Sequence, residues 1–164
     1  MKKIICAIRN CFKTYKPEPF WKSYYRASRQ PQGGLEYFKT LWAFYKVRKI
    51  EHKFNSSVGL KFGSGAIYEG IPTLPHGLSG IFINPKAVIG RNCTIFQQVT
   101  IGEAHEKAPV IGDNVLIGAG AKIIGGIHVG DNVKIGANCI VVEDIPANST
   151  VVMHKPRIIR IKDI

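Results

Sequence analysis

Aliphatic residues recur every six positions through the second half of this 164-residue chain. The first run is Ile83, Ile89, Ile95 and Ile101, and after one break a second run follows with Ile111, Ile117, Ile123, Val129, Ile135 and Val141. Glycine often comes directly after the aliphatic residue. A period of six matches neither the 3.6 residues of a helical turn nor the two-residue period of an ordinary strand. The repeat therefore predicts a parallel β-helix.

Three hexads would form one triangular coil of about 18 residues, stacked on the next coil at the spacing of paired strands. The aliphatic residue of each hexad faces the interior, and glycine or asparagine takes the corner because both tolerate a positive φ. Cys93 and Cys139 fall on small inward positions and are expected to be buried packing residues. An open sheet of short buried strands is the alternative, but ten hexads disfavour it.

The repeat is interrupted once, because Ile101 and Ile111 are ten residues apart instead of six. The core register resumes afterwards, so we expect the extra residues within 102–110 to loop outward. A first, degenerate hexad is expected at residues 62–66, and residues 68–77 depart from the repeat.

Basic residues are concentrated before the repeat. Residues 1–55 hold 13 of the 23 lysines and arginines and three glutamates, a net charge of +10, whereas residues 56–164 have a net charge of +2. We therefore divide the chain into a basic, aromatic-rich helical segment at 1–57, a β-helix domain at 58–152 and a basic C-terminal tail at 153–164. The expected fold class is mainly β, with a short N-terminal α-helical segment.

Two helices are expected in the basic segment. Residues 1–16 fit a basic amphipathic helix ended by Pro17 and Pro19, which would lie on a membrane interface or, as we favour, pack on a neighbouring subunit. A second helix is expected from Leu35, and its apolar face is formed by Leu35, Phe38, Leu41, Trp42 and Tyr45. Aromatic residues among lysines and arginines also occur in nucleic-acid-binding proteins. A solvated or oligomer-facing surface is the simpler interpretation, and we expect no nucleic-acid partner.

The N-terminus has a basic start, but its apolar stretch stops at Arg9, which is too short for a secretory signal or a membrane span. Nothing in the four cysteines requires an oxidising compartment, and Cys6 and Cys11 lack metal-ligand spacing. We expect a cytoplasmic protein without a metal site. Peripheral contact with the inner face of the membrane through residues 1–16 stays open.

A histidine motif precedes the first hexads. His76-Gly77 is followed by an aliphatic run and then by Gln97-Gln98-Val99-Thr100-Ile101-Gly102. This order resembles the hexapeptide-repeat acyltransferases, and within them the serine acetyltransferase branch, over about residues 60–152. The resemblance implies a left-handed coil, a homotrimer and acetyl-CoA as co-substrate.

The resemblance also assigns roles to individual residues. His76 would be the general base that takes the proton of an acceptor hydroxyl, a task that suits an imidazole at neutral pH. CoA would lie in a groove between subunits, against backbone at Gly102, Ala119 and Ala137. Four cations are candidates for its phosphates: Lys122, Lys134, Lys155 and Arg157. The alternatives are a loop histidine without a role and lysines at solvated corners.

The chain departs from the serine enzymes at several positions. Their aspartate fifteen residues before the histidine is replaced by Lys61, which leaves Glu69 as the nearest acidic candidate to orient His76. Their second histidine, in the protruding loop, is replaced by Ala108. His105 and Glu103 are the candidates to bind the acceptor in its place. His128 falls on an outward position and is expected at the surface.

These observations predict an acetyl-CoA-dependent O-acetyltransferase. The changed acceptor residues and the basic segment favour a sugar hydroxyl of a cell-surface or capsular polysaccharide as acceptor. The alternative is a serine O-acetyltransferase of cysteine biosynthesis. A second alternative is a non-catalytic trimeric scaffold, because a β-helix by itself implies no activity.

Overall fold

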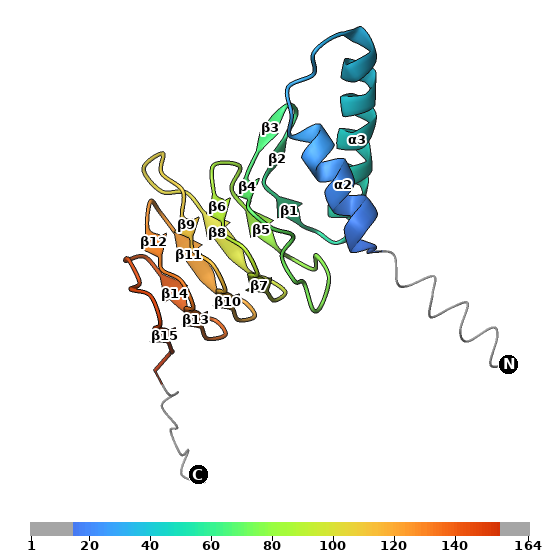
Figure 1. The fold of residues 1–164 in the computed structure, drawn as a ribbon. Helices are drawn as coiled ribbons and strands as arrows, with labels where there is room; N and C mark the ends of the chain where they lie inside the picture. The colour runs from blue at the N-terminus through green and yellow to red at the C-terminus, as the bar shows by residue number, and fades with distance from the viewer. Residues whose placement is uncertain (1–14, 155–164) are drawn as a thin grey trace, which may run out of the picture.

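The computed structural model describes residues 15–154. Two helices, α2 (Pro17–Ala27) and α3 (Gly34–Lys53), precede fifteen short strands (Figure 1). The strands are β1 (Ser57–Val58), β2 (Leu60–Lys61), β3 (Ser64–Gly65), β4 (Ile67–Tyr68), β5 (Phe82–Ile83), β6 (Val88–Ile89), β7 (Thr94–Ile95), β8 (Thr100–Gly102), β9 (Val110–Ile111), β10 (Leu116–Ile117), β11 (Lys122–Ile124), β12 (His128–Val129), β13 (Lys134–Ile135), β14 (Ile140–Val141) and β15 (Thr150–Val151).

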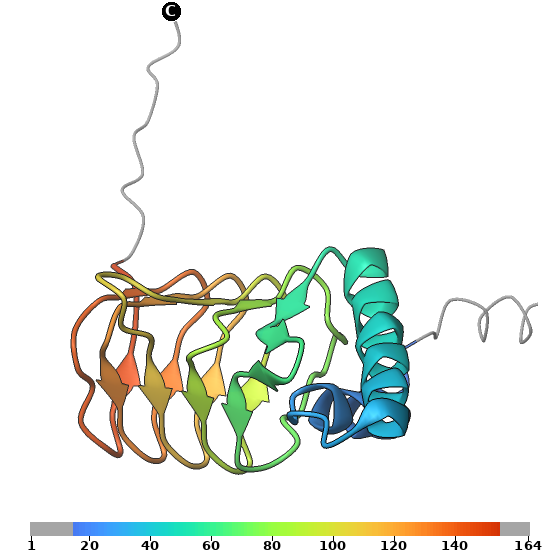
Figure 2. The same cartoon turned by 90° about the horizontal axis from the view of Figure 1, so that it is seen from above.

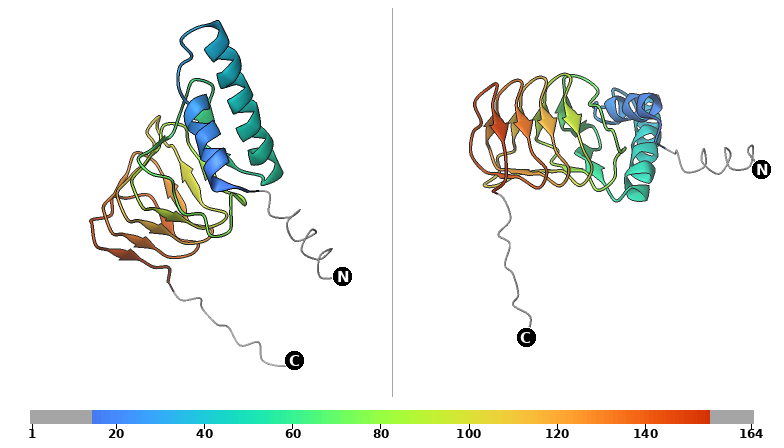
Figure 3. Two further views of the ribbon diagram at one scale, coloured as in Figure 1. Left: turned by 45° about the vertical axis from the view of Figure 1, so that its right-hand side comes forward. Right: turned by 90° about the horizontal axis from the view of Figure 1, so that it is seen from below.

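Three parallel sheets form the faces of a triangular prism (Figures 2 and 3). Face 1 has the order β1-β5-β8-β11-β14, face 2 has β4-β6-β9-β12, and face 3 has β7-β10-β13-β15. The chain passes from face 1 to face 2 to face 3 and returns to face 1 in the next coil. The prism is a left-handed parallel β-helix of about four turns, which confirms the predicted fold. The corners are named below by the faces that they join.

The core of the prism consists of the inward hexad residues. On face 1, Ile83 pairs with Ile101, Ile101 with Ile123, and Ile123 with Val141, so that each aliphatic side chain lies on its equivalent in the next coil. These residues are buried, and so are Cys93 and Cys139, as predicted. Burial of aliphatic surface is the main source of stability in such a stack.

Corner 2–3 carries a ladder of asparagines. Asn92, Asn114, Asn132 and Asn148 all adopt a positive φ between 55° and 60°. The amide of each donates to the side-chain oxygen of the next, at 3.3, 3.2 and 2.9 Å. Asparagine is therefore placed here both for its backbone conformation and for its self-complementary amide.

The break in the repeat is a loop at corner 1–2, between β8 and β9, as predicted. Its base is tied to the preceding coil, because Lys86 Nζ lies 3.0 Å from the carboxylate of Glu103 and donates to the backbone oxygen of Glu106 at 3.2 Å. Ala104 and Lys107 form an antiparallel bridge within the loop. Residues 62–66, expected as a hexad, instead belong to the antiparallel hairpin of β2 and β3.

The two helices form an antiparallel hairpin over one end of the prism (Figure 2). Phe20, Trp21 and Tyr24 of α2 are buried, and the Tyr24 hydroxyl donates to the backbone oxygen of Ala66 at 2.8 Å. The helices thus shield the apolar end of the first coil, as terminal elements of repeat proteins must. Helix α2 was not expected from the sequence. Pro17 begins it, because proline is tolerated in a first helical turn.

Helix α3 exposes the apolar face formed by Leu35, Phe38, Leu41, Trp42 and Tyr45. Its aromatic face is exposed, with Phe38 at 68% and Trp42 at 60% relative exposure. The face packed inward consists of Thr40, Ala43, Val47 and Glu51. Most of the predicted helix at residues 1–16 lies outside the described residues. Within residues 15–154, no helix combines the length and apolar character needed to cross a bilayer.

Glu51 is a buried carboxylate that links α3 to the prism. Its two oxygens accept from the backbone N–H of Val58 at 2.7 Å and from the Arg48 guanidinium at 3.0 Å. Burial raises the pKa of Glu51, and these two donors partly offset the effect. Arg48 also donates to the backbone oxygen of Leu60 at 3.0 Å, so the pair holds the first coil against the helix.

Candidate active site

The loop that carries His76 leaves face 3 after the bridge between Thr73 and Thr94 and returns to face 1 at β5. Backbone hydrogen bonds anchor the part of the loop after His76, from Gly80 N–H to Phe54 O at 3.1 Å and from Gln98 N–H to Ser79 O at 2.9 Å. Gly77 has a φ of +67°, which favours glycine directly after the histidine. His76 is therefore exposed on an anchored loop at corner 3–1.

The imidazole of His76 is oriented by two residues of the next coil. Its Nδ1 lies 2.5 Å from Oε1 of Gln97, and its ring meets Phe96 edge-on at 5.8 Å between centroids. An amide oxygen can only accept, so with this orientation Nδ1 carries the hydrogen. In the neutral ring the lone pair is then on Nε2, which is the arrangement that a general base needs.

Glu69, the candidate orienting carboxylate, lies elsewhere. It follows β4 at corner 2–3, whereas His76 is at corner 3–1, at the other end of face 3. Its carboxylate lies 4.0 Å from Nε of Arg91. The structure thus gives His76 an amide partner from Gln97 and places Glu69 beside Arg91. Lys61 is exposed on the β2–β3 hairpin.

Several predicted cofactor-binding residues stack along corner 3–1. Gly120 N–H donates to Gln97 O at 3.0 Å, and Asn138 N–H donates to Ala119 O at 2.8 Å, so Gln97, Ala119 and Ala137 occupy the same place in successive coils. Lys122 starts the adjoining strand, and its Nζ donates to Gln98 O at 2.9 Å. We call His76 with these four residues the His76 column: Gln97, Ala119, Lys122 and Ala137.

The column suits a long ligand with an acyl end and a charged end. Ala119, Gly120 and Ala137 have small side chains or none, so backbone groups at this corner are accessible along the prism. The ammonium group of Lys122 adds a cation beside Gln98, the residue that follows the His76 partner Gln97. The residues present therefore fit an extended thioester ligand such as acetyl-CoA. Lys155 and Arg157 lie outside the described residues.

A second group of predicted residues lies at corner 1–2. Glu103 and His105 belong to the loop, and His105 is exposed with a φ of +50°. A pocket of about 470 Å³ separates this loop from the following coils, lined by Ala104, His105, Lys107, Ile124, Gly125, Gly126, Ile127 and Val142. Gly102 ends β8 before the loop, and a Cβ there would lie 2.9 Å from Cδ1 of Ile124, so a larger residue would require the Ile124 side chain to shift.

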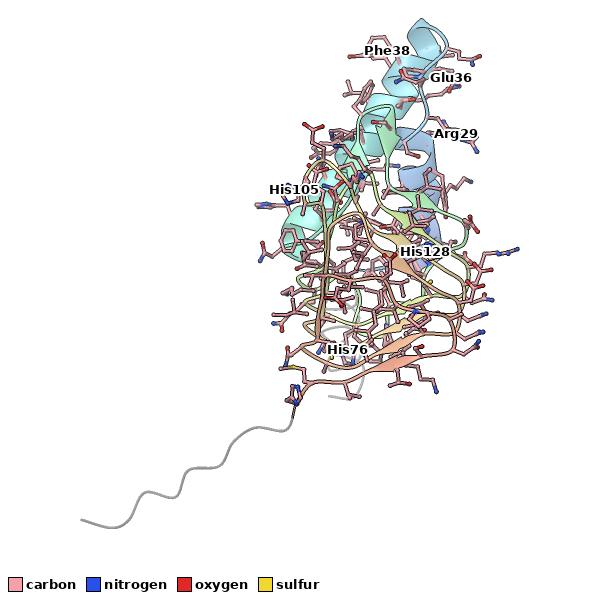
Figure 4. All side chains as sticks on the ribbon, turned by 90° about the vertical axis from the view of Figure 1, so that its left-hand side faces the viewer. Arg29, Glu36, Phe38, His76, His105 and His128 are labelled. Carbon is pink, nitrogen blue, oxygen red and sulfur yellow. The ribbon has the colours of Figure 1, made fainter. Side chains whose placement is uncertain are left out.

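The two groups do not meet within one chain. His76 and His105 lie at the two opposite edges of face 1, and Figure 4 shows them at separate edges of the prism, with His128 on another side. Lys134 is exposed on face 3, and His128 is exposed on face 2, as predicted for a surface residue. A site containing both His76 and the loop therefore requires a second copy of the chain.

Gln97 and Phe96 were not among the predicted partners of His76. Gln97 lies 21 residues after His76, which is roughly one coil, and so the two residues share a corner. The coil length was the signal that could have found this pair. It was obscured because the loop before β5 departs from the hexad count.

Comparisons with known proteins agree with this geometry. Residues 108–142 match the family model "Bacterial transferase hexapeptide (six repeats)". A serine acetyltransferase of Staphylococcus aureus is 48% identical over 113 residues, which cover 66% of this chain and 53% of that protein. A serine acetyltransferase of Synechococcus elongatus is 37% identical over 117 residues, covering 68% and 47%. The chain thus spans about half the length of these relatives.

Solved structures give the same result. Serine acetyltransferase isoform 3 of Entamoeba histolytica, in complex with cysteine, superposes with a TM-score of 0.64 at 31% identity, covering 79% of this chain and 46% of that chain. The Neisseria gonorrhoeae enzyme in complex with serine gives 0.58 at 36% identity, covering 71% and 48%. A serine acetyltransferase in complex with CoA gives 0.61 at 29% identity, covering 80% and 50%. The chain therefore belongs to the hexapeptide-repeat acyltransferases, in the serine acetyltransferase-like branch.

Proposed function

We propose that this chain is an O-acetyltransferase that moves an acetyl group from acetyl-CoA to a hydroxyl. The contact between His76 Nδ1 and Gln97 Oε1 carries the proposal, because it fixes the ring and leaves Nε2 as the basic atom. The membership of the chain in a family of acetyltransferases supports the same reaction. Acetyl-CoA would supply the acetyl thioester.

The role of His76 follows from the path of the proton during the reaction. Nε2 takes the proton of the acceptor hydroxyl as its oxygen forms a bond to the thioester carbonyl carbon. The C–S bond then breaks, and the imidazolium returns the proton to the leaving sulfur. The products are an acetyl ester and a free thiol, and the histidine is regenerated. Backbone N–H groups near the column are suited to hold the oxygen that becomes negative.

Serine is the acceptor that the relatives support best, and we propose it as the first substrate to test. The S. aureus and S. elongatus relatives are serine acetyltransferases, and the N. gonorrhoeae structure contains serine. This choice differs from the polysaccharide acceptor expected from the sequence.

A sugar hydroxyl remains the second candidate because of two positions. Lys61 stands where the serine enzymes have an aspartate, and Ala108 where they have the loop histidine. An acceptor without an amino-acid carboxylate and ammonium would not need those groups. The loop at corner 1–2, with Glu103 and His105, would then form the part of the site that distinguishes acceptors.

We also propose a homotrimer as the active form. The His76 column and the loop lie on opposite edges of face 1, so a cyclic arrangement would bring the column of one copy to the loop of the next. Cyclic symmetry repeats this contact around the ring and forms one site for each subunit.

The experiment that tests the function follows the release of free CoA thiol from acetyl-CoA. L-serine is the acceptor in one arm, and a panel of sugars and oligosaccharides in the other. Turnover with serine supports the first candidate, and turnover only with a saccharide supports the second. His76→Ala is the matched control, and it should lower turnover by about 10² to 10⁴ while the melting temperature stays unchanged. A chain that shows no turnover and no thermal shift with acetyl-CoA would be a scaffold, contrary to the proposal.

A further inference from the structure

Helix α3 is apolar on two opposite sides. Its inner side packs small residues such as Ala43 and Val47 against α2 and the first coil. Its outer side carries exposed apolar and aromatic residues: Leu35, Phe38, Leu41, Trp42 and Tyr45. Leu35 and Phe38 are 72% and 68% exposed, which is unusual for two neighbouring large apolar side chains on one helix face. Such a face indicates a binding surface.

On this outer side, two aromatic rings pack against each other and one of them also contacts a lysine. The rings of Trp42 and Tyr45 stack at 5.7 Å between centroids, and Lys46 Nζ lies 5.5 Å from the Trp42 ring. Tryptophan and tyrosine combine an apolar ring with a polar atom, and both are enriched where hydrocarbon meets water. Leucine and phenylalanine towards the helix start supply the wholly apolar part of the face.

Three adjoining grooves beside this face are strongly basic. They lie between α2 and α3, or beside their connection, with volumes of about 810, 440 and 310 Å³. Seven cations line them: Lys16, Lys22, Arg26, Arg29, Lys39, Lys46 and Lys49. Glu36 is the acidic residue among the lining residues, and it pairs with Lys39 at 3.1 Å. The surface is therefore complementary to a dense array of anions.

We infer that the outer surface of the α2–α3 hairpin binds the surface of an anionic lipid bilayer. Phe38, Trp42 and Tyr45 enter the interface, and Lys22, Arg26 and Lys46 contact lipid phosphates beside them. An apolar helix face flanked by cations is the pattern of a helix that lies in the membrane plane. Each lysine or arginine near an anionic surface strengthens binding, and the apolar face converts that attraction into insertion.

The architecture is compatible with this orientation. The hairpin covers one end of the prism, so its outer side points away from the coils (Figures 1 and 2). Figure 4 shows Phe38 and His76 at opposite ends of the structure in that view, so lipid binding at α3 leaves the His76 loop uncovered. The inference does not depend on the acceptor or on the acetyl transfer.

Tryptophan fluorescence provides a direct test with the full chain. The chain has two tryptophans; Trp21 is fully buried and Trp42 is exposed. Vesicles of phosphatidylcholine mixed with phosphatidylglycerol should shift the emission to shorter wavelength and carry the protein with them on flotation. Vesicles of phosphatidylcholine alone should do neither. The shift should be absent in Trp42→Phe, because Trp21 is already in an apolar environment.

Charge reversal locates the surface. Lys22→Glu/Lys46→Glu removes two cations of the grooves and should weaken vesicle binding by more than about tenfold. Lys107→Glu/Lys134→Glu changes the net charge equally on the prism, where both lysines are exposed, and should leave binding within about twofold of the unmodified chain. Equal losses in the two double variants would mean attraction by net charge alone and would overturn the assignment to this surface.

Two further outcomes would also contradict the inference. If a Trp42 shift depends on protein concentration without vesicles, the face binds a second copy of the chain. If RNA or an anionic polysaccharide gives the shift and anionic vesicles do not, the surface binds a polyanion. Absence of binding to both kinds of vesicle at low salt would exclude a membrane surface as the partner.

Discussion

His76 and Gln97 come from consecutive coils, and Nδ1 of the imidazole lies 2.5 Å from Oε1 of the amide. A neutral amide thus takes the orienting place that a carboxylate has in many catalytic histidine pairs. It fixes the ring and the tautomer without adding a negative charge beside it. The pair connects the loop before β5 to the corner after β7, so the orientation of His76 depends on the stacking of the coils.

Replacing Gln97 should change catalysis without unfolding the chain. Gln97→Ala removes the acceptor of the Nδ1–H, and the loss of one hydrogen bond in the site should lower kcat/KM by about tenfold. Gln97→Glu keeps an acceptor but adds a negative charge, which favours the imidazolium, so the acid limb of kcat/KM should move to higher pH. The pH profile checks this role. An unchanged profile in Gln97→Glu would show that the amide does not position the base.

Complementation tests whether two copies share one site. We expect His76→Ala and His105→Ala each to lower activity as homo-oligomers. Co-expressed in equal amounts, they should recover about one quarter of the unmodified activity, because one interface in four combines an intact His76 with an intact His105. No recovery, in oligomers that are shown to be mixed, would mean that both residues act from the same chain. Unreduced activity of His105→Ala by itself would mean that His105 has no role.

Gly118 should tolerate no side chain. A Cβ there would lie 2.6 Å from Ala137 N, and 2.8 Å from Gly136 C and Ile135 O, all of them backbone atoms of the next coil. Gly118→Ala should therefore lower the free energy of unfolding by about 1–3 kcal/mol and reduce the melting temperature. Gly34→Ala is the control, because a Cβ there has no neighbour within 4 Å. Equal melting temperatures for the two variants would contradict the close packing of the coils.

Buried tyrosines should make the fold sensitive to alkaline pH. Burial raises the pKa of Tyr15 to about 12, and it also raises the pKa values of Tyr24 and Tyr68. An unfolded tyrosine ionises near about pH 10, so the unfolded state loses protons first. The stabilisation is complete below that pH and is lost as the pH rises through the folded-state values.

An alkaline titration checks this prediction by absorbance and circular dichroism. The tyrosinate absorbance of the buried residues should appear in one cooperative step, together with the loss of the β-sheet signal. Tyr68→Phe should reduce the steepness of that step, at some cost in stability because Val58 O loses its donor at 3.0 Å. Gradual ionisation of all six tyrosines with the β-sheet signal intact would contradict the burial.

The sequence alone determined the coil, its core and the place of the outward loop. The hexad is a local pattern, and each inward aliphatic residue, such as Ile101 or Ile123, is buried by its own equivalents in the neighbouring coils. The place of the asparagines at the corners could be predicted from the same local pattern. His76 could be chosen from its motif, because the residues around it are contiguous in the chain.

Only the tertiary structure decided which partner His76 has and which side of α3 is buried. Gln97 reaches the histidine across the stacking of two coils, after a loop whose path the repeat does not specify. For α3, the periodicity indicated an apolar face but not whether that face is buried, and the small residues Ala43 and Val47 on the other side allow the close packing against α2 and the prism. Periodicity gives the faces of a helix, but shape complementarity with its neighbours selects the one that is buried.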